Sequence, residues 1–171
     1  MNENIFWELI EYCWEPFNMD ETRRLAISKP TPQVLQSLSE VLNNQIILLL
    51  DEELDKLSKE DLLLFDQILE RKLYDIDREE LYEVIEGGED LFLYRRGFIV
   101  GIGKAYYEAI NNNPSIANDN GAFRWDDAHT FCEDICFNPI YIYKNKFDEN
   151  VRIPPTGISR ESGSNEDKWS Y

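Results

Sequence analysis

Residues 91–110 read LFLYRRGFIVGIGKAYYEAI, and this stretch decides the class of fold. Its apolar residues recur at helical spacing, so it predicts one long helix. Three glycines interrupt the pattern, namely Gly97, Gly101 and Gly103. Each costs about 1 kcal/mol relative to alanine inside a helix, so each needs a reason. Close contact with a neighbouring helix would supply that reason, and the stretch therefore favours a fold of packed helices.

The same helical spacing recurs on both sides of this stretch. We expect further helices over residues 3–14, 32–55, 59–74, 78–86 and 125–137, while residues 140–143 alternate and are open to a strand. Side chains that cap helix N-termini precede four of these segments. They are Asn2, Thr31, Ser58 and Asp77.

The chain divides by composition into two parts. Residues 1–147 carry the helical pattern and predict a mainly α, single-domain bundle of about six to seven helices. From residue 148 onward the composition shifts to proline, serine, glycine and charged residues. Residues 148–171 are therefore predicted to form a polar tail that is flexible or only weakly docked.

The net charge excludes several classes of partner. The 171 residues include 34 acidic and 17 basic side chains, which give a charge of −17. Phosphate backbones and anionic membranes both reward clustered lysine and arginine, so we expect neither nucleic acid nor a membrane as a partner. The chain has an odd number of cysteines, no export signal, and no apolar run long enough to cross a bilayer. We therefore expect a cytoplasmic protein.

One set of side chains has the chemistry of a metal site. His129, Cys132 and Cys136 are spaced so that one helical face presents all three, and Asp126 is a possible fourth zinc ligand. Structural zinc sites usually draw ligands from two paired elements, so small buried thiols are the favoured interpretation. A His129–Cys132 nucleophile pair would lack an oxyanion turn. We expect no metal, no cofactor and no enzymatic activity, with a metal-dependent enzyme as the lesser alternative.

Two further patterns have structural interpretations. Residues 75–86 superficially match a calcium loop, but Glu80 stands where the sharp turn of that loop requires glycine. The segment is therefore interpreted as a solvated acidic helix face. Arg96 lies in an otherwise apolar segment and can reach a carboxylate such as Asp77 or Asp90. We interpret it as half of a buried ion pair, with a ligand anion as the alternative.

Several motifs resemble one bacterial family, the domain of unknown function 4240. They are Phe6-Trp7-Glu8-Leu9-Ile10, Phe65-Asp66, Gly87-Gly88, Arg96-Gly97-Phe98-Ile99 and Asn113-Pro114. The resemblance covers most of residues 5–115 and implies a helical fold. Some members of the family accompany toxin–immunity gene pairs. This chain departs from the family pattern in a shorter loop between Gly88 and Phe92, and in Arg95, which replaces an aromatic residue.

The acidic residues are concentrated in the middle of the chain. Residues 51–100 hold 16 acidic and 7 basic side chains, so −9 of the total −17 lies there. We interpret this region as a surface that attracts a basic protein. The predicted binding residues are Asp51, Glu52, Glu53, Asp55, Asp75, Asp77, Glu79, Glu80, Glu83, Glu86, Glu89 and Asp90, with Tyr82 and Tyr94 as aromatic anchors.

The functional expectation combines these features. We expect a non-enzymatic immunity protein that neutralises a cognate toxin domain, as a monomer or a weak homodimer. Nuclease toxins are basic because their substrate is a polyanion, so an acidic partner can occupy the same surface. The alternative of a different class is an intracellular regulatory or scaffold domain whose tail docks elsewhere.

Overall fold

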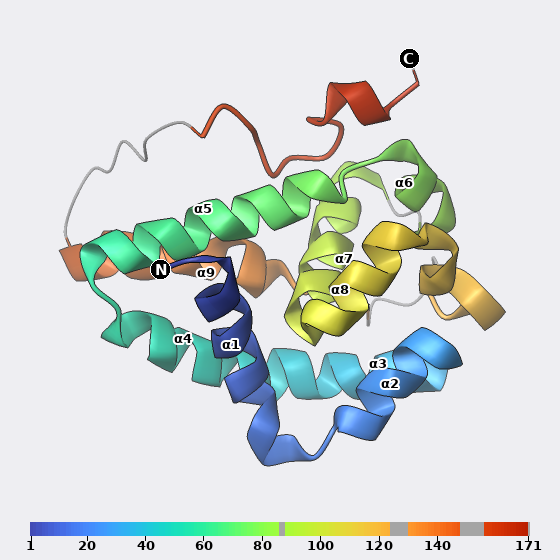
Figure 1. Ribbon diagram of the computed structural model, residues 1–171, viewed down its shortest axis with the longest axis horizontal. Coiled ribbons are helices and arrows are strands. Elements are labelled where there is room, and N and C mark those ends of the chain that lie inside the picture. Colours follow the sequence, from blue (N-terminus) through green and yellow to red (C-terminus); the bar gives the residue numbers. More distant parts are fainter. Residues whose placement is uncertain (86–87, 124–129, 148–155, 171) are drawn as a thin grey trace.

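The computed structural model describes residues 1–85, 88–123, 130–147 and 156–170. These residues form helices and no strand, which confirms the mainly α class. The described part of the chain contains nine α-helices, where six to seven were predicted, and their arrangement is drawn in Figure 1. They are α1 (Glu3–Trp14), α2 (Asp20–Ser28), α3 (Pro32–Val41), α4 (Ile47–Lys56), α5 (Lys59–Asp75), α6 (Glu79–Ile85), α7 (Gly88–Ile102), α8 (Lys104–Asn112) and α9 (Glu133–Phe147).

Helix α9 is the centre of the bundle, because it packs against α4, α5 and α7. Helix α1 crosses α4 and also contacts α5, while α2 packs between α3 and α8 (Figure 1). One continuous apolar core joins these layers. Its largest fully buried apolar side chains include Trp14, Phe6, Phe65, Phe92 and Phe98.

Three of the four predicted helix caps are confirmed. The side-chain oxygens of Asn2, Thr31 and Ser58 accept hydrogen bonds from backbone N–H groups three residues later, at 3.1, 3.3 and 3.1 Å. These bonds satisfy donors that would otherwise lack a partner in the first turn. The prediction for Asp77 is wrong. Its carboxylate is fully buried and bonds to the C-terminal segment instead.

Several helix boundaries differ from the prediction. The continuous helix expected over residues 32–55 contains a π-helical turn at Leu42–Ile46, which separates α3 from α4. Helix α2 lies in a stretch that the apolar pattern left without a helix. Residues 140–143 belong to α9 and not to a strand, and α9 continues through Pro139. The first part of the helix predicted at residues 125–137 lies outside the described residues.

The long helix predicted over residues 91–110 is broken at Gly103. This residue has φ of 114°, so α7 ends just before it and α8 begins just after it. A Cβ atom here would overlap the side chains of Arg23 and Glu11, so glycine is required for space as well as for conformation. Helical spacing continues across the break, which is why the apolar pattern did not reveal it.

Side chains from α1 and α2 hold both sides of this break. Trp14 Nε1 donates to the carbonyl of Gly101 at 2.9 Å, and Arg23 Nε donates to the carbonyl of Ile102 at 2.8 Å. Glu11 accepts the first N–H of α8, from Lys104, at 3.0 Å. These contacts satisfy backbone groups that the break leaves without helical partners.

The other two glycines of this stretch serve close packing, as predicted. A Cβ atom on Gly97 would lie 2.5 Å from the carbonyl oxygen of Cys132, and one on Gly101 would lie 3.0 Å from Leu42. Gly97 therefore allows α7 to approach the start of α9 closely, where Cys132 N–H donates to the carbonyl of Tyr94 at 2.9 Å. No helix in the described residues is long and apolar enough to cross a membrane.

The described part of the tail is docked against the helices. Residues 156–170 run along α5 and reach α6, at the top of the view in Figure 1. They end in a short 3-10 turn, Glu166–Lys168. Polar groups dock most of this segment, and the Trp169 ring adds a contact with Tyr82 and Phe92.

Candidate functional site

The predicted acidic residues of α4 are only partly free. Glu52 and Asp55 are exposed. Glu53 is half-buried and forms an ion pair with Lys56 at 2.6 Å. Asp51 is also half-buried and accepts a hydrogen bond from Asn138 of α9 at 2.7 Å. Burial raises the pKa of Asp51 from 3.8 to about 6, although the bond from Asn138 opposes this shift.

The predicted acidic residues near α6 separate into an exposed and a docked group. Glu80, Glu83 and Asp90 are exposed. Asp75 and Glu79 are half-buried beside the tail, where the Asp75 carbonyl accepts from Lys168 and the Glu79 carboxylate from the backbone of Ser170. Glu86 and the side chain of Glu89 lie outside the described residues.

Asp77 does not belong to any surface, which corrects its assignment to the partner-binding set. Its side chain is 0% exposed. Its carboxylate accepts hydrogen bonds from the N–H groups of Gly163 and Asn165 at 3.0 and 2.9 Å, and from the Ser164 hydroxyl at 3.2 Å. The donors come from a segment about 86 residues later, so only the folded structure brings them together.

The two predicted aromatic anchors are also partly covered. The Tyr82 ring packs against Phe92 and Trp169, with centroids 5.2 and 5.4 Å apart. The Tyr94 ring packs against Phe137 at 6.4 Å. Both tyrosine side chains are half-buried, so part of each ring is already in contact with its own chain.

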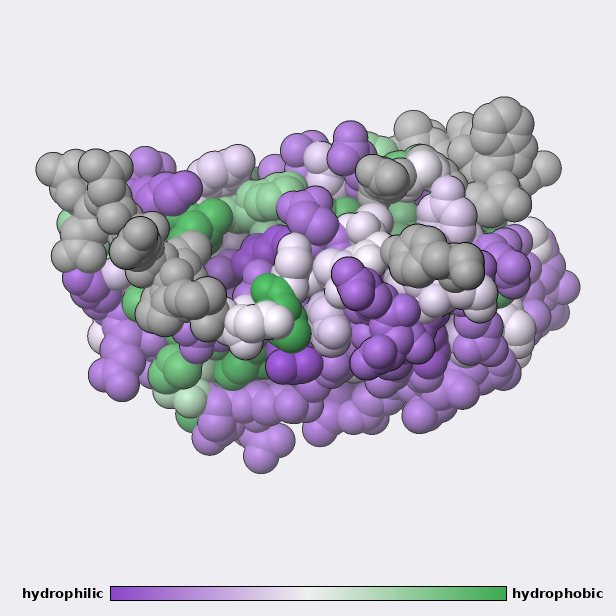
Figure 2. Space-filling model, turned by 90° about the horizontal axis from the view of Figure 1, so that it is seen from above, coloured by the Kyte–Doolittle hydropathy of each residue, from purple (hydrophilic) through white to green (hydrophobic). Residues whose placement is uncertain are grey.

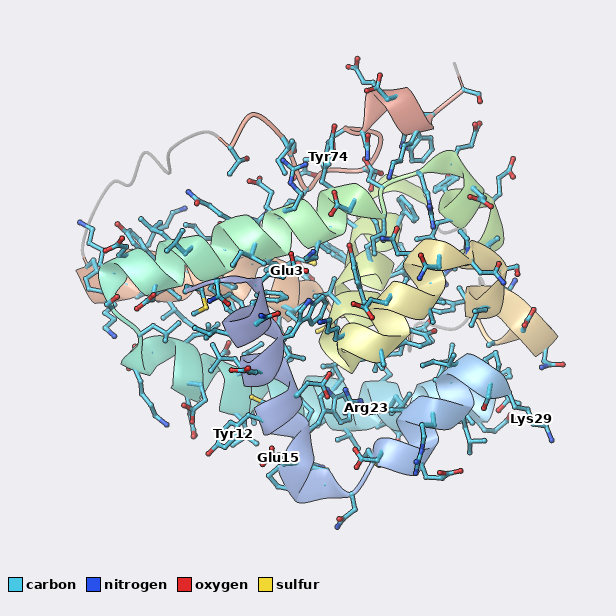
Figure 3. The ribbon with its side chains drawn as sticks, viewed as in Figure 1. Glu3, Tyr12, Glu15, Arg23, Lys29 and Tyr74 are labelled. Carbon is cyan, nitrogen blue, oxygen red and sulfur yellow. The ribbon has the colours of Figure 1, made fainter. Side chains whose placement is uncertain are left out.

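The exposed large apolar side chains lie elsewhere. Tyr12 is 55% exposed and Leu48 is 62% exposed, and Ile5 and Tyr141 are the other exposed members of this class among the described residues. Three of the four lie on α1 and α4, which pack against each other. Figure 3 shows Tyr12 and Glu15 together at the end of α1. Tyr12 was not among the predicted binding residues, because that prediction rested on runs of acidic residues and α1 contains no such run.

These residues define a surface that we call the α1–α4 face. On α1 it contains Ile5, Glu8 and Tyr12, followed by Glu15, at the spacing of one helix face. On α4 it contains Leu48, Glu52 and Asp55 at a similar spacing. The segments 3–15 and 47–56 together carry eight acidic side chains and one lysine. Four of these acidic side chains, Glu8, Glu15, Glu52 and Asp55, lie on the face, which therefore combines apolar side chains with exposed carboxylates.

A second group of charges is buried beneath the tail. The Arg96 side chain is 0% exposed and lies 3.9 Å from Asp77, which is the ion pair that the sequence suggested. Its Nη1 donates to the carbonyl of Leu73 at 2.7 Å, and its Nη2 donates to the carbonyl of Arg160 at 2.9 Å. Burial lowers the pKa of Arg96, and the charge of Asp77 opposes that shift.

Asp66 of α5 is the third buried charge of this group, which we call the Asp66–Asp77–Arg96 cluster. Arg160 Nη2 lies 2.9 Å from both carboxylate oxygens of Asp66, and Arg160 Nη1 donates to the carbonyl of Cys136. Burial raises the pKa of Asp66, while the adjacent guanidinium opposes this. Sequence reasoning missed Asp66 and Arg160 as partners, and the only available signal was the Phe65-Asp66 motif.

The cysteine residues have the chemistry of core side chains. Cys132 and Cys136 are both fully buried, and burial raises the pKa of each thiol, to about 12 for Cys136. High pKa values disfavour the thiolate that metal binding and nucleophilic attack require. His129 and Asp126 lie outside the described residues, and no group of metal-binding side chains occurs in the described ones.

Two hollows share Glu11 of α1, the first being lined mainly by α2 and α8 and the second mainly by α1. One of about 270 Å³ is lined by Arg23, Arg24, Ile27 and Tyr106, and one of about 220 Å³ by Trp7, Glu8 and Lys104, with Glu11 shared by both. The charges in the first hollow are already engaged, because Arg23 binds Glu11 at 2.6 Å and the end of α7. These hollows therefore border the contacts that hold the break at Gly103.

Comparison with known proteins identifies a family but no individual similar protein. A family model described as a protein of unknown function (DUF4240) matches residues 1–147. No curated protein and no solved structure matches the chain. The described tail residues 156–170 lie outside the matched range.

Proposed function

The chain belongs to the DUF4240 family, and we propose that it is a non-enzymatic domain that binds a basic protein through the α1–α4 face. The observation that carries this proposal is the coincidence of exposed apolar side chains and exposed carboxylates on that face. Glu8, Glu15, Glu52 and Asp55 form no ion pair within the part of the chain that the structure describes.

The two features have different roles in binding. Tyrosine is enriched among the residues that dominate interface energies, and its truncation at such a position typically costs about 2 kcal/mol or more. Tyr12 and Leu48 are the candidates for that role, since they are the most exposed of the large apolar side chains on this face. The surrounding carboxylates attract a basic partner from a distance and can raise the association rate to about 10⁸–10⁹ M⁻¹s⁻¹ at low salt.

The partner proposed is a bacterial toxin domain, which the chain would neutralise as an immunity protein in the cytoplasm. A nuclease domain fits the chemistry, because a protein that binds nucleic acid carries clustered lysine and arginine. The net charge of −17 complements such a surface. The resemblance to a family with members beside toxin genes supports the same partner class.

The test is binding to the product of a neighbouring toxin gene, measured at low and high salt. Tyr12→Ala should weaken binding by about tenfold or more, and Glu8→Lys with Glu52→Lys should slow association most strongly at low salt. The matched control is Glu80→Lys with Glu83→Lys, which changes the charge by the same amount on α6.

Two results would contradict the proposal. The first is the absence of any complex at low salt together with no protection of cells that express the toxin. The second is a complex that the α6 variant weakens and the α1–α4 variant leaves unchanged, which would place the interface on another acidic surface.

A further inference from the structure

The tail forms hydrogen bonds with charged side chains that are buried in the helical part of the chain. Residues 159–165 contain no regular helix and include a turn, in which the Ser164 N–H donates to the carbonyl of Glu161 at 3.3 Å. This segment supplies partners to all three members of the Asp66–Asp77–Arg96 cluster. The cluster itself comes from α5, from α7 and from the short connection between α5 and α6, which contains Asp77.

The contact to Asp66 is specific for an arginine side chain. Both carboxylate oxygens accept from one guanidinium nitrogen of Arg160, and the other terminal nitrogen donates to a backbone carbonyl at the start of α9. Glu70 adds a second carboxylate 4.0 Å from Arg160 Nε. A planar guanidinium can satisfy these acceptors together, whereas a lysine ammonium cannot match the same fork.

The contact to Asp77 mainly recognises backbone N–H groups. Two of its three hydrogen-bond donors are main-chain N–H groups, at Gly163 and Asn165. Any peptide that adopts the same turn can present such groups. Arg96 in turn binds the Arg160 carbonyl and the Ser162 hydroxyl, and its Nε has no hydrogen-bond partner among the described residues. The cluster thus recognises one arginine followed by a polar turn.

The family match separates this site from the segment that fills it. The matched range, residues 1–147, contains Asp66, Asp77 and Arg96, while the tail lies beyond it. Without the tail, Asp66 has no hydrogen-bond donor among the described residues, and Asp77 retains only the ion pair with Arg96. Buried charges of this kind require a partner.

We propose that the Asp66–Asp77–Arg96 cluster is a peptide-binding site, and that residues 159–165 occupy it as an intramolecular ligand. The external ligand is a short segment of another protein in which an arginine directly precedes a turn, with N–H groups three and five residues after the arginine that donate to Asp77. This inference does not depend on the function proposed for the α1–α4 face. A tethered ligand competes at an effective concentration on the order of millimolar, so the tail keeps the site closed to weak ligands.

The test uses the full chain and a fluorescent peptide with the sequence of residues 158–169, ISRESGSNEDKW. Anisotropy is measured in about 0.15 M salt, where charges more than about 8 Å apart are screened. The Arg160→Ala chain should bind the peptide about tenfold more tightly than the unchanged chain, because its own tail has lost a charge-assisted contact. Arg24→Ala, which removes an exposed arginine from α2, is the matched control and should give no gain.

Two further variants define the chemistry of the site. A peptide with alanine in place of its arginine should bind the Arg160→Ala chain about tenfold more weakly. Asp66→Asn added to Arg160→Ala should remove the gain, since it removes the acceptor charge for the guanidinium. Equal binding by the two peptides, or no gain in a folded Arg160→Ala chain, would overturn the proposal.

Hydrogen exchange of the unchanged chain provides an independent measurement. The amides of Gly163 and Asn165 should exchange at least about tenfold faster than the core amides of α5 and α7, because a bound ligand can leave without global unfolding. If these amides exchange only with global unfolding, or if Arg160→Ala fails to fold by circular dichroism, the tail is part of the cooperative core and the proposal is wrong.

Discussion

Replacement of Gly97 by alanine tests the contact on which the centre of the bundle depends. The added Cβ would lie 2.5 Å from the Cys132 carbonyl oxygen and 2.6 Å from Cys136 Sγ, with Ile135 Cγ2 at 3.0 Å. All three atoms belong to the start of α9 or the residue just before it. A backbone carbonyl cannot rotate away as a side chain can, so α7 and α9 must separate.

The expected magnitude is a balance of two effects. Alanine stabilises a helix by about 1 kcal/mol relative to glycine. Overpacking of a filled core costs about 1–3 kcal/mol, and here it also strains the bond from Cys132 N–H to the Tyr94 carbonyl. We expect Gly97→Ala to lower the free energy of unfolding by about 2 kcal/mol, which corresponds to about 4–8 °C in Tm for a chain of this size.

Gly101→Ala is the matched control on the same helix. Its Cβ would meet the two methyl groups of Leu42 at 3.0 Å and Ile135 Cδ1 at 3.4 Å, and all of these are the ends of flexible side chains. Small shifts can relieve that contact, and the gain in helix propensity offsets the remaining strain. We expect a change smaller than about 1 kcal/mol in either direction.

Both variants are compared by urea unfolding, followed by circular dichroism and by tryptophan fluorescence. Coincident transitions by the two probes justify a two-state analysis. A Gly97→Ala chain as stable as the unchanged one, or equal losses in the two variants, would refute the close approach of α7 to α9.

Three further predictions concern single side chains. The pKa of Asp51 is raised from 3.8 to about 6 in the folded chain, so its contribution to stability is present below pH 4 and is lost as the pH rises through 6. Asp51→Asn should therefore gain stability over the unchanged chain between pH 4 and pH 7, as measured by urea unfolding at each pH. Glu11→Ala should lower the free energy of unfolding by about 1–2 kcal/mol, because it removes the acceptor for the first N–H of α8 and the partner of Arg23, whereas exposed Glu8→Ala should change it by less than about 0.5 kcal/mol. Cys13, Cys132 and Cys136 are all buried with raised pKa values, so a thiol reagent should modify none of them in the folded chain and all three in urea.

Local signals in the sequence predicted the beginnings of helices well. Asn2, Thr31 and Ser58 cap the helices that they were expected to cap, because capping depends on residues three positions apart. The break at Gly103 could not be predicted in the same way. It depends on Glu11 and Arg23, which lie about 80–90 residues earlier and fill the space that a Cβ would need.

The candidate binding residues show the same division between local and distant causes. Asp77 and Glu80 look alike in an acidic run, yet one is buried and the other exposed. The tail covers Asp77 and donates three hydrogen bonds to it from about 86 residues later, a distance over which no local pattern acts. An ion pair of Arg96 with Asp77 or Asp90 was predictable, since an arginine in a mostly apolar segment needs a carboxylate, and the structure selects Asp77. Its contact with Arg160 was not.

The contacts of Glu11, Trp14 and Arg23 with the backbone around Gly103 also have a consequence for folding during synthesis. Glu11, Trp14 and Arg23 leave the ribosome first, but their backbone partners at residues 101–104 follow about 80–90 residues later. At about 5–20 residues per second, α1 and α2 wait at least several seconds for those partners. During that interval the apolar side of α1, which includes Phe6, Trp7 and Trp14, has no finished core to enter. Helix α1 is thus a segment that a chaperone would protect until residues 101–104 have been made.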